Sequence, residues 1–429
     1  MKAKEKYIKQ INERYVSTRK RSKELFDEAC RYMPGGDTRT STFFEPYPHR
    51  IVEAQGAYMY DADGNKLIDF QNNFTSLIHG HAHPPTVEAV SNQMKKGTAY
   101  ASPFPGQSEL AKLLVERIPG VDMLRFTNSG TDSTMNVLQA ACAYTNRAKI
   151  VKVEGGYHGT TDVFEASKDV LVAPFNYIEE TKAVIEKNHQ DIACFIVEPV
   201  LGSAGQILPQ GGYLEFTREI TKHYGILLVF DEIVTLRLAM GGAQELFNID
   251  PDLTAFGKII GGGIPIGAFG GKEEIMKIYD PRAKKMYHSG TFNGNAAAMA
   301  AGLAAMSDFT YDKLVHINTL GTQFKASLEE AFKEIGVHVK VNGTGSLFNL
   351  IFSDKDAIDY RGVAGSHEGL NRLLFLDLLT RGVFNAPRGM FCMSTAMTGE
   401  DIDFAAGAIK GALFDMKETI KEIAPELVF

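Results

Sequence analysis

Between about residue 105 and residue 310, apolar runs rich in β-branched and aromatic residues alternate with stretches of helical character. These runs lie at residues 123–127, 149–153, 192–197, 226–230 and 253–256. Strands separated by helices are typical of βαβ units, whose strands are parallel. Residues 194–197 and 227–230 show no polar alternation, as expected for strands buried on both faces. We therefore predict an α/β fold with a mainly parallel sheet sandwiched by helices.

The chain of 429 residues is longer than the roughly 250–300 residues that one core supports, so we expect a second domain. Residues 1–33 have helical spacing, and two short strands around the turn at residues 61–64 predict a hairpin. After about residue 310 the pattern becomes helix, short strands and helix. We predict a large domain at 76–310, with residues 1–75 and 311–429 together forming a smaller α+β domain.

Composition excludes several classes of function. The formal net charge is −7 and no Lys/Arg block is dense, which disfavours nucleic acid as a partner. Four cysteines lie far apart without a CxxC pair, so neither a disulfide framework nor a zinc site is indicated. No apolar stretch approaches the roughly 18–20 residues of a membrane span. We expect a soluble cytoplasmic protein that acts on small molecules.

Ligands of open α/β sheets bind beyond the carboxyl ends of the strands, and two of the predicted strands end in informative residues. Ser129, Gly130 and Thr131 follow residues 123–127 and precede a helix, which is a suitable seat for a phosphate. Taken alone, helix capping is the simpler explanation of these residues. Asp231 ends the strand at 226–230, where a carboxylate can hold a protonated pyridine nitrogen. A nucleotide hydrolase is excluded because the chain has no GxxxxGK[ST] loop.

Lys258 follows the strand at 253–256 and stands in an apolar, glycine-rich surround. Desolvation lowers the pKa of a lysine and makes its neutral amine available as a nucleophile. Asp231 precedes Lys258 by 27 residues, close to one βαβ step of roughly 30 residues, so both side chains can emerge at one sheet edge. An anion seat, an acid for a pyridinium and a nucleophilic lysine are the set that pyridoxal 5′-phosphate (PLP) requires.

The chain resembles the class III (ω-type) PLP-dependent aminotransferases of fold type I over nearly its whole length. The segments that carry this resemblance are residues 230–233, 251–254, 257–263 and 288–295. Within the class, the chain is most similar to the β-phenylalanine aminotransferase and glutamate-1-semialdehyde aminomutase group.

The resemblance implies a role for each matching residue. Lys258 would carry PLP as a Schiff base, Asp231 would keep the pyridine nitrogen protonated, and Glu198 would support the site by hydrogen bonding. Ser129, Gly130 and Thr131 would contact the phosphate, and Tyr157 and Ile233 would cover the two faces of the ring. Thr291 would contact the phosphate of a neighbouring subunit's cofactor. The last contact implies a homodimer.

Two arginines in turns suit carboxylate substrates, because a guanidinium can bind a carboxylate through two hydrogen bonds. By the same resemblance, Arg39 would bind the carboxylate of a β-amino acid and Arg388 that of 2-oxoglutarate. Ser203 stands where some ω-aminotransferases carry a glutamate, which argues against an ornithine- or GABA-type mechanism. His79, His81 and His83 alternate in the sequence, but we expect polar packing there and no metal site.

The segment after the acidic pair guides the choice of reaction. Aminomutases usually have Gly-aromatic-Arg here, whereas this chain has Ile233 to Arg237 without that glycine. We therefore expect transamination of a β-amino acid, or of a β-aminoacyl thioester, with 2-oxoglutarate as acceptor. The alternative is a glutamate-1-semialdehyde 2,1-aminomutase, which converts its substrate to 5-aminolevulinate without an added acceptor. A non-catalytic sensor or scaffold is a remote third possibility.

Overall fold

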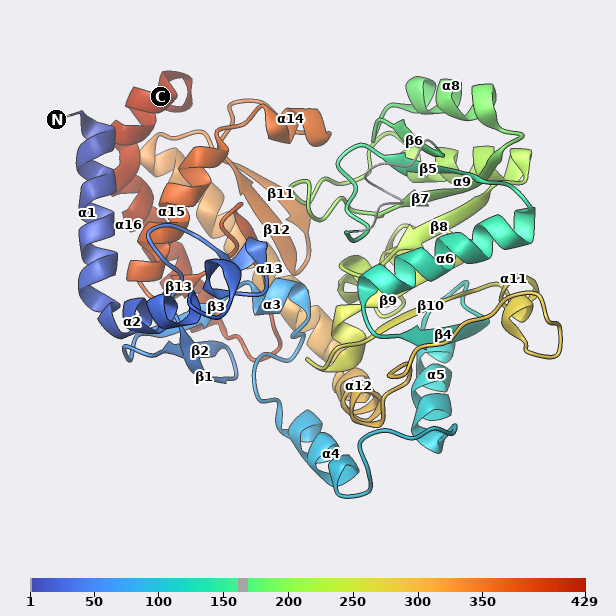
Figure 1. The fold of residues 1–429 in the computed structure, drawn as a ribbon. Coiled ribbons are helices and arrows are strands. Elements are labelled where there is room, and N and C mark those ends of the chain that lie inside the picture. Colours follow the sequence, from blue (N-terminus) through green and yellow to red (C-terminus); the bar gives the residue numbers. More distant parts are fainter. Residues whose placement is uncertain (1, 161–168) are drawn as a thin grey trace.

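The computed structural model describes residues 2–160 and 169–429. Its largest sheet has seven strands in the order β4-β10-β9-β8-β7-β5-β6, drawn on the right of Figure 1. The strands are β4 (Met123–Thr127), β10 (Gly267–Gly271), β9 (Leu253–Gly257), β8 (Leu227–Asp231), β7 (Ile192–Val197), β5 (Lys149–Val153) and β6 (Val170–Ala173). Only β10 runs antiparallel to its neighbours. The predicted mainly parallel α/β sheet is confirmed.

Helices cover both faces of this sheet, because successive side chains of a buried strand point to opposite faces. Phe195 and Val197 pack with residues of α8 (Ile178–Asn188) and α9 (Tyr213–Tyr224). Cys194 and Ile196 pack with α6 (Gly130–Thr145) and α11 (Glu273–Met276) on the other face. The remaining helical elements of this part are α4 (Pro84–Met94), α5 (Pro105–Arg117), η3 (Thr235–Leu238), α10 (Ala243–Leu246), η4 (Lys258–Gly261), η5 (Lys277–Tyr279) and α12 (Ala296–Asp308).

The two ends of the chain come together in a second α+β region, seen on the left of Figure 1. One sheet pairs β1 (Ile51–Gln55), β2 (Tyr58–Asp61) and β3 (Lys66–Asp69) with β13 (Val383–Phe384), and a second joins β11 (Lys340–Thr344), β12 (Leu347–Ile351) and β14 (Met390–Cys392). The helical elements are α1 (Ala3–Thr18), α2 (Lys20–Ala29), η1 (Pro34–Gly36), η2 (Thr40–Thr42), α3 (Asn72–Thr75), α13 (Tyr311–Ile335), α14 (Tyr360–Ala364), α15 (Glu368–Thr380), α16 (Gly399–Ile423) and η6 (Pro425–Leu427). The domain boundaries at residues 75 and 310 stay predictions.

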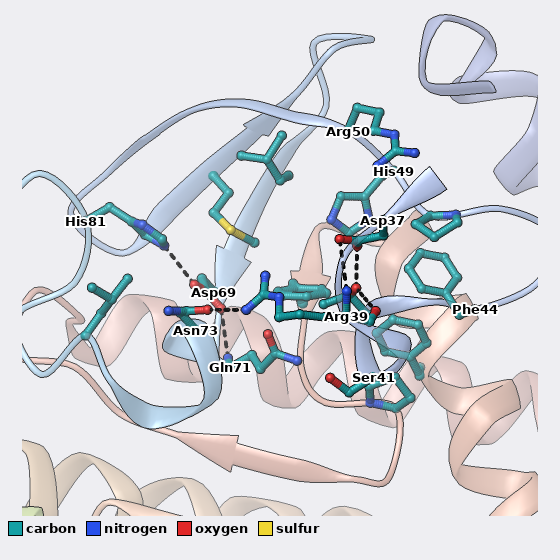
Figure 2. Close-up of a pocket in the computed structure, with 18 of the residues that line it drawn as sticks. Asp37, Arg39, Ser41, Phe44, His49, Arg50, Asp69, Gln71, Asn73 and His81 are labelled. Carbon is teal, nitrogen blue, oxygen red and sulfur yellow. Dashed lines mark hydrogen bonds and ion pairs between the residues drawn. The ribbon is translucent and has the colours of Figure 1, made fainter. Parts of the chain in front are cut away.

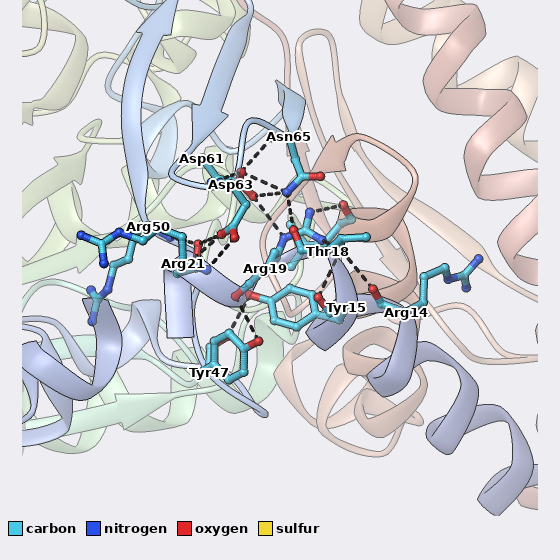
Figure 3. A network of polar contacts seen from close by, with 12 residues as sticks. Arg14, Tyr15, Thr18, Arg19, Arg21, Tyr47, Arg50, Asp61, Asp63 and Asn65 are labelled. Carbon is cyan, nitrogen blue, oxygen red and sulfur yellow. Dashed lines mark hydrogen bonds and ion pairs between the residues drawn. The ribbon is translucent and has the colours of Figure 1, made fainter. Parts of the chain in front are cut away.

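The single N-terminal helix expected over residues 1–33 is in fact broken at Arg19, whose φ of −135° ends α1. The Arg19 guanidinium is fully buried, lies 3.3 Å from the Asp61 carboxylate and donates to Leu379 O at 2.7 Å (Figure 3). The start of α2 donates to Asp63 through the backbone and hydroxyl of Ser22. This network ties α1 and α2 to the β2–β3 turn and so fixes where the chain enters the segment with Arg39.

Residues 72–75 form a turn of the opposite hand to an ordinary helix. The φ angles of Asn72, Asn73, Phe74 and Thr75 are 48°, 47°, 54° and 72°. For L-residues a left-handed turn costs about 1–2 kcal/mol per residue, least for Asn. Asp69 holds the turn, because its Oδ1 accepts the N–H groups of Gln71 and Asn72 at 2.8 Å each. Such strain is found most often at functional sites.

Candidate active site

The carboxyl ends of neighbouring parallel strands bring the predicted site residues to one edge of the large sheet. Lys258 directly follows β9, Asp231 ends β8 and Glu198 directly follows β7. Tyr157 lies in the loop after β5, and Ser129 lies between β4 and α6. These residues therefore lie at one edge of the sheet, and their roles stay predictions.

The loop between β4 and α6 is built as a helix N-terminus. Ser129 caps α6, and its Oγ accepts the N–H of Asp132 at 3.1 Å. The N–H groups of Gly130 and Thr131 lie in the first turn, which has no intrahelical acceptors for them. A Cβ on Gly130 would lie 2.8 Å from Ile233 Cδ1, so a larger residue here would require the Ile233 side chain to move. The first turn of α6 can therefore accept a phosphate.

Asp231 is buried at the end of β8 and has two hydrogen-bonding partners. Its Oδ2 lies 2.8 Å from His158 Nδ1, and its Oδ1 accepts the N–H of Ile233 at 3.1 Å. His158 is also buried, so the pair is shielded from water. The sequence pattern indicates no role for His158; only the fold shows that it reaches the carboxylate 73 residues further along the chain.

Glu198 joins the two loops on either side of it. Its Oε1 accepts the N–H of Tyr157 at 2.9 Å, and its Oε2 accepts the N–H of Gly202 at 3.0 Å. Burial raises the pKa of the Glu198 carboxyl to about 7, and the nearby Asp231 charge acts in the same direction. Glu198 therefore positions the Tyr157 backbone, while the Tyr157 side chain is 54% exposed.

The backbone of Lys258 has a left-handed φ of 52°, which residues other than glycine and asparagine seldom adopt. Burial lowers the pKa of its ammonium group, and the carboxylates of Glu198 and Asp231 partly offset this effect. A lysine of lowered pKa beside a helix N-terminus and a buried acid matches the chemistry that PLP needs: Schiff-base formation, phosphate binding and a proton held at a ring nitrogen. The residues present therefore fit the cofactor.

A cavity of about 730 Å³ opens onto Lys258. Arg388 lines it, as do Phe74 and Thr75 from the left-handed turn and Ser203 and Gln206 from the loop after β7. Arg388 is exposed, and within residues 2–160 and 169–429 no ion pair or hydrogen bond of its guanidinium is found. The structure thus brings Arg388 and Lys258 to one cavity.

Arg39 lies elsewhere, in an adjoining cavity of about 410 Å³ (Figure 2). Its Nη1 donates to Asn73 Oδ1 at 2.9 Å, and its guanidinium lies 5.9 Å from the centroid of the Phe74 ring. Ser41 and Phe44 line both cavities, so the two adjoin. Thr291 lies in an exposed segment next to Phe292, which is 58% exposed.

The alternating histidines His79, His81 and His83 do not all point in one direction. His81 turns to Asp69, whereas His79 and His83 stack on each other and approach Asp308, which the sequence analysis missed. One potential ligand atom of each of these last three residues lies within 4.8 Å of the others. Both ring nitrogens of His79 are hydrogen-bonded, and the Lys313 ammonium already contacts Asp308. This arrangement suits polar packing, and the absence of a metal site stays a prediction.

Comparison with known proteins places the chain in a family. The model of the class III aminotransferases matches residues 44–169 and 165–412. The chain belongs to this family. Class III aminotransferases use PLP, and this chain is a PLP-dependent enzyme that acts on small molecules.

Three relatives illustrate the range of the family. The glutamate-1-semialdehyde 2,1-aminomutase of Methanosphaera stadtmanae is 38% identical, with 92% of this chain and 98% of the relative covered. An ω-transaminase from Sphaerobacter thermophilus is 39% identical, with a TM-score of 0.90 and coverage of 92% and 98%. A β-phenylalanine aminotransferase from Variovorax paradoxus is 35% identical, with a TM-score of 0.93 and coverage of 96% and 98%.

The expectation of β-amino acid or β-aminoacyl thioester transamination with 2-oxoglutarate is wrong. Curated relatives about 38% identical over nearly the whole chain are glutamate-1-semialdehyde 2,1-aminomutases, from several methanogens. The structure shows why the segment at 233–237 led to the wrong choice of reaction. Arg237 is fully buried and donates to Ser346 Oγ and to the carbonyl of Met393. Arg237 therefore contributes to packing between loops and does not indicate the substrate.

Among the residues that the structure describes, no helix is long and apolar enough to cross a membrane.

Proposed function

We propose that this protein is a glutamate-1-semialdehyde 2,1-aminomutase. The observation that carries the proposal is the full-length similarity to curated enzymes of that name, such as that of Methanosphaera stadtmanae. The reaction exchanges an amino and an oxo group between adjacent carbons of one molecule. Such an enzyme has to bind one carboxylate and two nitrogen-bearing positions, and it needs no second substrate.

Bound PLP supplies an electron-accepting ring and a carbonyl that exchanges amino groups. Lys258 would hold the cofactor covalently and, once its amine is displaced by substrate, would carry a proton between the substrate carbon and the cofactor. Asp231, oriented by His158, would keep the ring nitrogen protonated. The desolvated position of Lys258 supports this assignment because its lowered pKa leaves more of the amine neutral near pH 7.

The remaining contacts follow from the positions of the loops. Ser129, Gly130 and Thr131 would bind the phosphate at the start of α6. Tyr157 and Ile233 would cover the two faces of the ring, with Glu198 fixing the backbone of the Tyr157 loop.

Arg388 is our candidate for the substrate carboxylate, in place of the 2-oxoglutarate role first expected. Its guanidinium lines the Lys258 cavity and is unpaired within the described part of the chain. Arg39 would stay outside the cavity, bonded to Asn73. Thr291 would complete the phosphate site of a second subunit, so the proposal includes a homodimer in a cytoplasmic setting.

Incubation of the holoenzyme with glutamate-1-semialdehyde alone tests the proposal. We expect 5-aminolevulinate to form without any 2-oxo acid. If product appears only when a 2-oxo acid or another amino acceptor is added, the protein is a transaminase and the proposed function fails.

A further inference from the structure

Two residues of the Lys258 cavity share three unusual properties. Thr75 and Gln206 are 1% and 0% exposed, and both have left-handed backbones, with φ of 72° and 57°. In both, a side-chain oxygen has no hydrogen-bond partner among the described residues: Thr75 Oγ1 and Gln206 Oε1. Both line the cavity onto which Lys258 opens.

Each of these properties is unfavourable for folding. A buried polar group without a partner costs about 1–3 kcal/mol, and a left-handed residue other than glycine costs a similar amount. Strain and unmet hydrogen bonding at two separate points of one cavity wall are hard to explain by packing. A ligand that supplies the missing partners explains both.

The surrounding contacts fix what these two residues offer. Gln206 Nε2 donates to Gly202 O at 3.3 Å, which leaves Oε1 as an acceptor. Gly202 is in turn held by Glu198. On the other side, the carbonyl of Thr75 accepts from Arg237 at 3.5 Å, so the residue is held through its backbone and its hydroxyl is left for a ligand.

An amide oxygen accepts hydrogen bonds and donates none, and a hydroxyl can also accept. Because Gln206 Oε1 can only accept and the Thr75 hydroxyl can accept, the pair suits a donor such as an amine or ammonium group better than a carboxylate. The unpaired Arg388 at the same cavity suits the carboxylate instead.

We propose that Thr75 Oγ1 and Gln206 Oε1 form an amine subsite that holds one amino group of the diamine formed within the turnover while the other reacts with the cofactor at Lys258. This inference rests on the proposed aminomutase function, in which both nitrogen-bearing carbons belong to one molecule. An enzyme of this kind has to retain a diamine within one turnover, and two acceptors in a closed wall perform that retention.

The test compares two ligands that differ by one amino group, 4,5-diaminovalerate and 5-aminovalerate. Each is titrated into the holoenzyme, and the absorbance of the Lys258-bound cofactor reports binding. Thr75→Val removes the hydroxyl and Gln206→Met removes Oε1 together with the Nε2 donor to Gly202 O, each at nearly constant volume. Valine preserves the β-branching of threonine at the strained position. Thr75→Ser and Gln206→Glu, which keep an acceptor, are the matched controls.

We expect the wild type to prefer the diamine. Because a hydrogen bond to a charged group is lost, Thr75→Val and Gln206→Met should each weaken diamine binding roughly tenfold or more and leave 5-aminovalerate within about twofold. The two controls should retain the preference. Melting temperature and cofactor absorbance identify a variant that is misfolded. If Thr75→Val or Gln206→Met is misfolded, the diamine preference of Thr75→Ser and Gln206→Glu decides instead.

The proposal is overturned if the wild type shows no preference for the diamine, or if the preference persists in both Thr75→Val and Gln206→Met. The proposed function fails separately, by the absence of 5-aminolevulinate from glutamate-1-semialdehyde alone. A diamine preference that both variants abolish in an enzyme without aminomutase activity would keep the subsite and reject the reaction.

Discussion

Replacing Asp69 should destabilise the protein strongly, because this buried carboxylate holds the left-handed turn at residues 72–75. Its Oδ1 accepts the N–H groups of Gln71 and Asn72 at 2.8 Å each, and its Oδ2 lies 2.7 Å from His81 Nε2. Asp69→Ala leaves both N–H groups buried without a partner. Hydrogen bonds to a charged group contribute about 1.5–3 kcal/mol each, so we expect a loss of about 3–5 kcal/mol. Asp69→Asn keeps an oxygen for the two N–H groups and should cost about 1 kcal/mol.

Differential scanning calorimetry of the holoenzyme measures the effect. At about 2 °C per kcal/mol, Asp69→Ala should lower the melting temperature by roughly 6–10 °C and Asp69→Asn by roughly 2 °C. Asp354→Ala, which alters an exposed aspartate, controls for charge removal and should leave it unchanged. If the alanine and asparagine variants melt within a degree of each other, the two backbone hydrogen bonds do not stabilise the turn and the reasoning is refuted.

Three further predictions follow from the site. Burial raises the Glu198 pKa to about 7, so the stability that its neutral form provides is complete below pH 4.5 and is lost as the pH rises to 7. As the pH rises from 4.5 to 7, the melting temperature of Glu198→Gln should therefore increase relative to that of cofactor-free wild type. A difference in melting temperature that stays constant over this range would contradict the raised pKa of the Glu198 carboxyl. Arg388→Gln should raise KM for glutamate-1-semialdehyde roughly tenfold or more with a smaller change in kcat, as steady-state kinetics would show; an unchanged KM would remove Arg388 from the substrate site. Thr291→Ala should weaken both PLP binding and dimerisation in sedimentation velocity at micromolar concentration, and an active monomer would exclude the shared site.

Sequence reasoning located most of the sheet because its strands are long apolar runs between helices. It missed the short β6 (Val170–Ala173) and also β10 (Gly267–Gly271), whose three glycines have no β-strand preference and fit because backbone approaches there closely. A Cβ on Gly270 would lie 2.5 Å from Met123 O. Local pattern cannot report such tertiary contacts.

The site was predictable where the signal is local and unpredictable where it depends on the fold. Lys258 and Asp231 follow apolar runs, so strand topology alone places them at one edge. His158 reaches Asp231 from a loop 73 residues away, and no spacing rule indicates that contact. Arg39 was assigned to substrate by family resemblance, and its hydrogen bond to Asn73 in a cavity adjoining that of Lys258 could not be read from the sequence. The left-handed backbone conformation of Thr75 and Gln206 cannot be predicted from their residue types.

Counting product per active site tests the central claim most directly. Holoenzyme of known Lys258-bound cofactor content is mixed with a large excess of glutamate-1-semialdehyde and no amino acceptor, and 5-aminolevulinate is measured over time. An aminomutase should form many equivalents of 5-aminolevulinate per site, one for each substrate molecule consumed. Consumption that stops after one equivalent per site and resumes only when a 2-oxo acid is added would contradict the account.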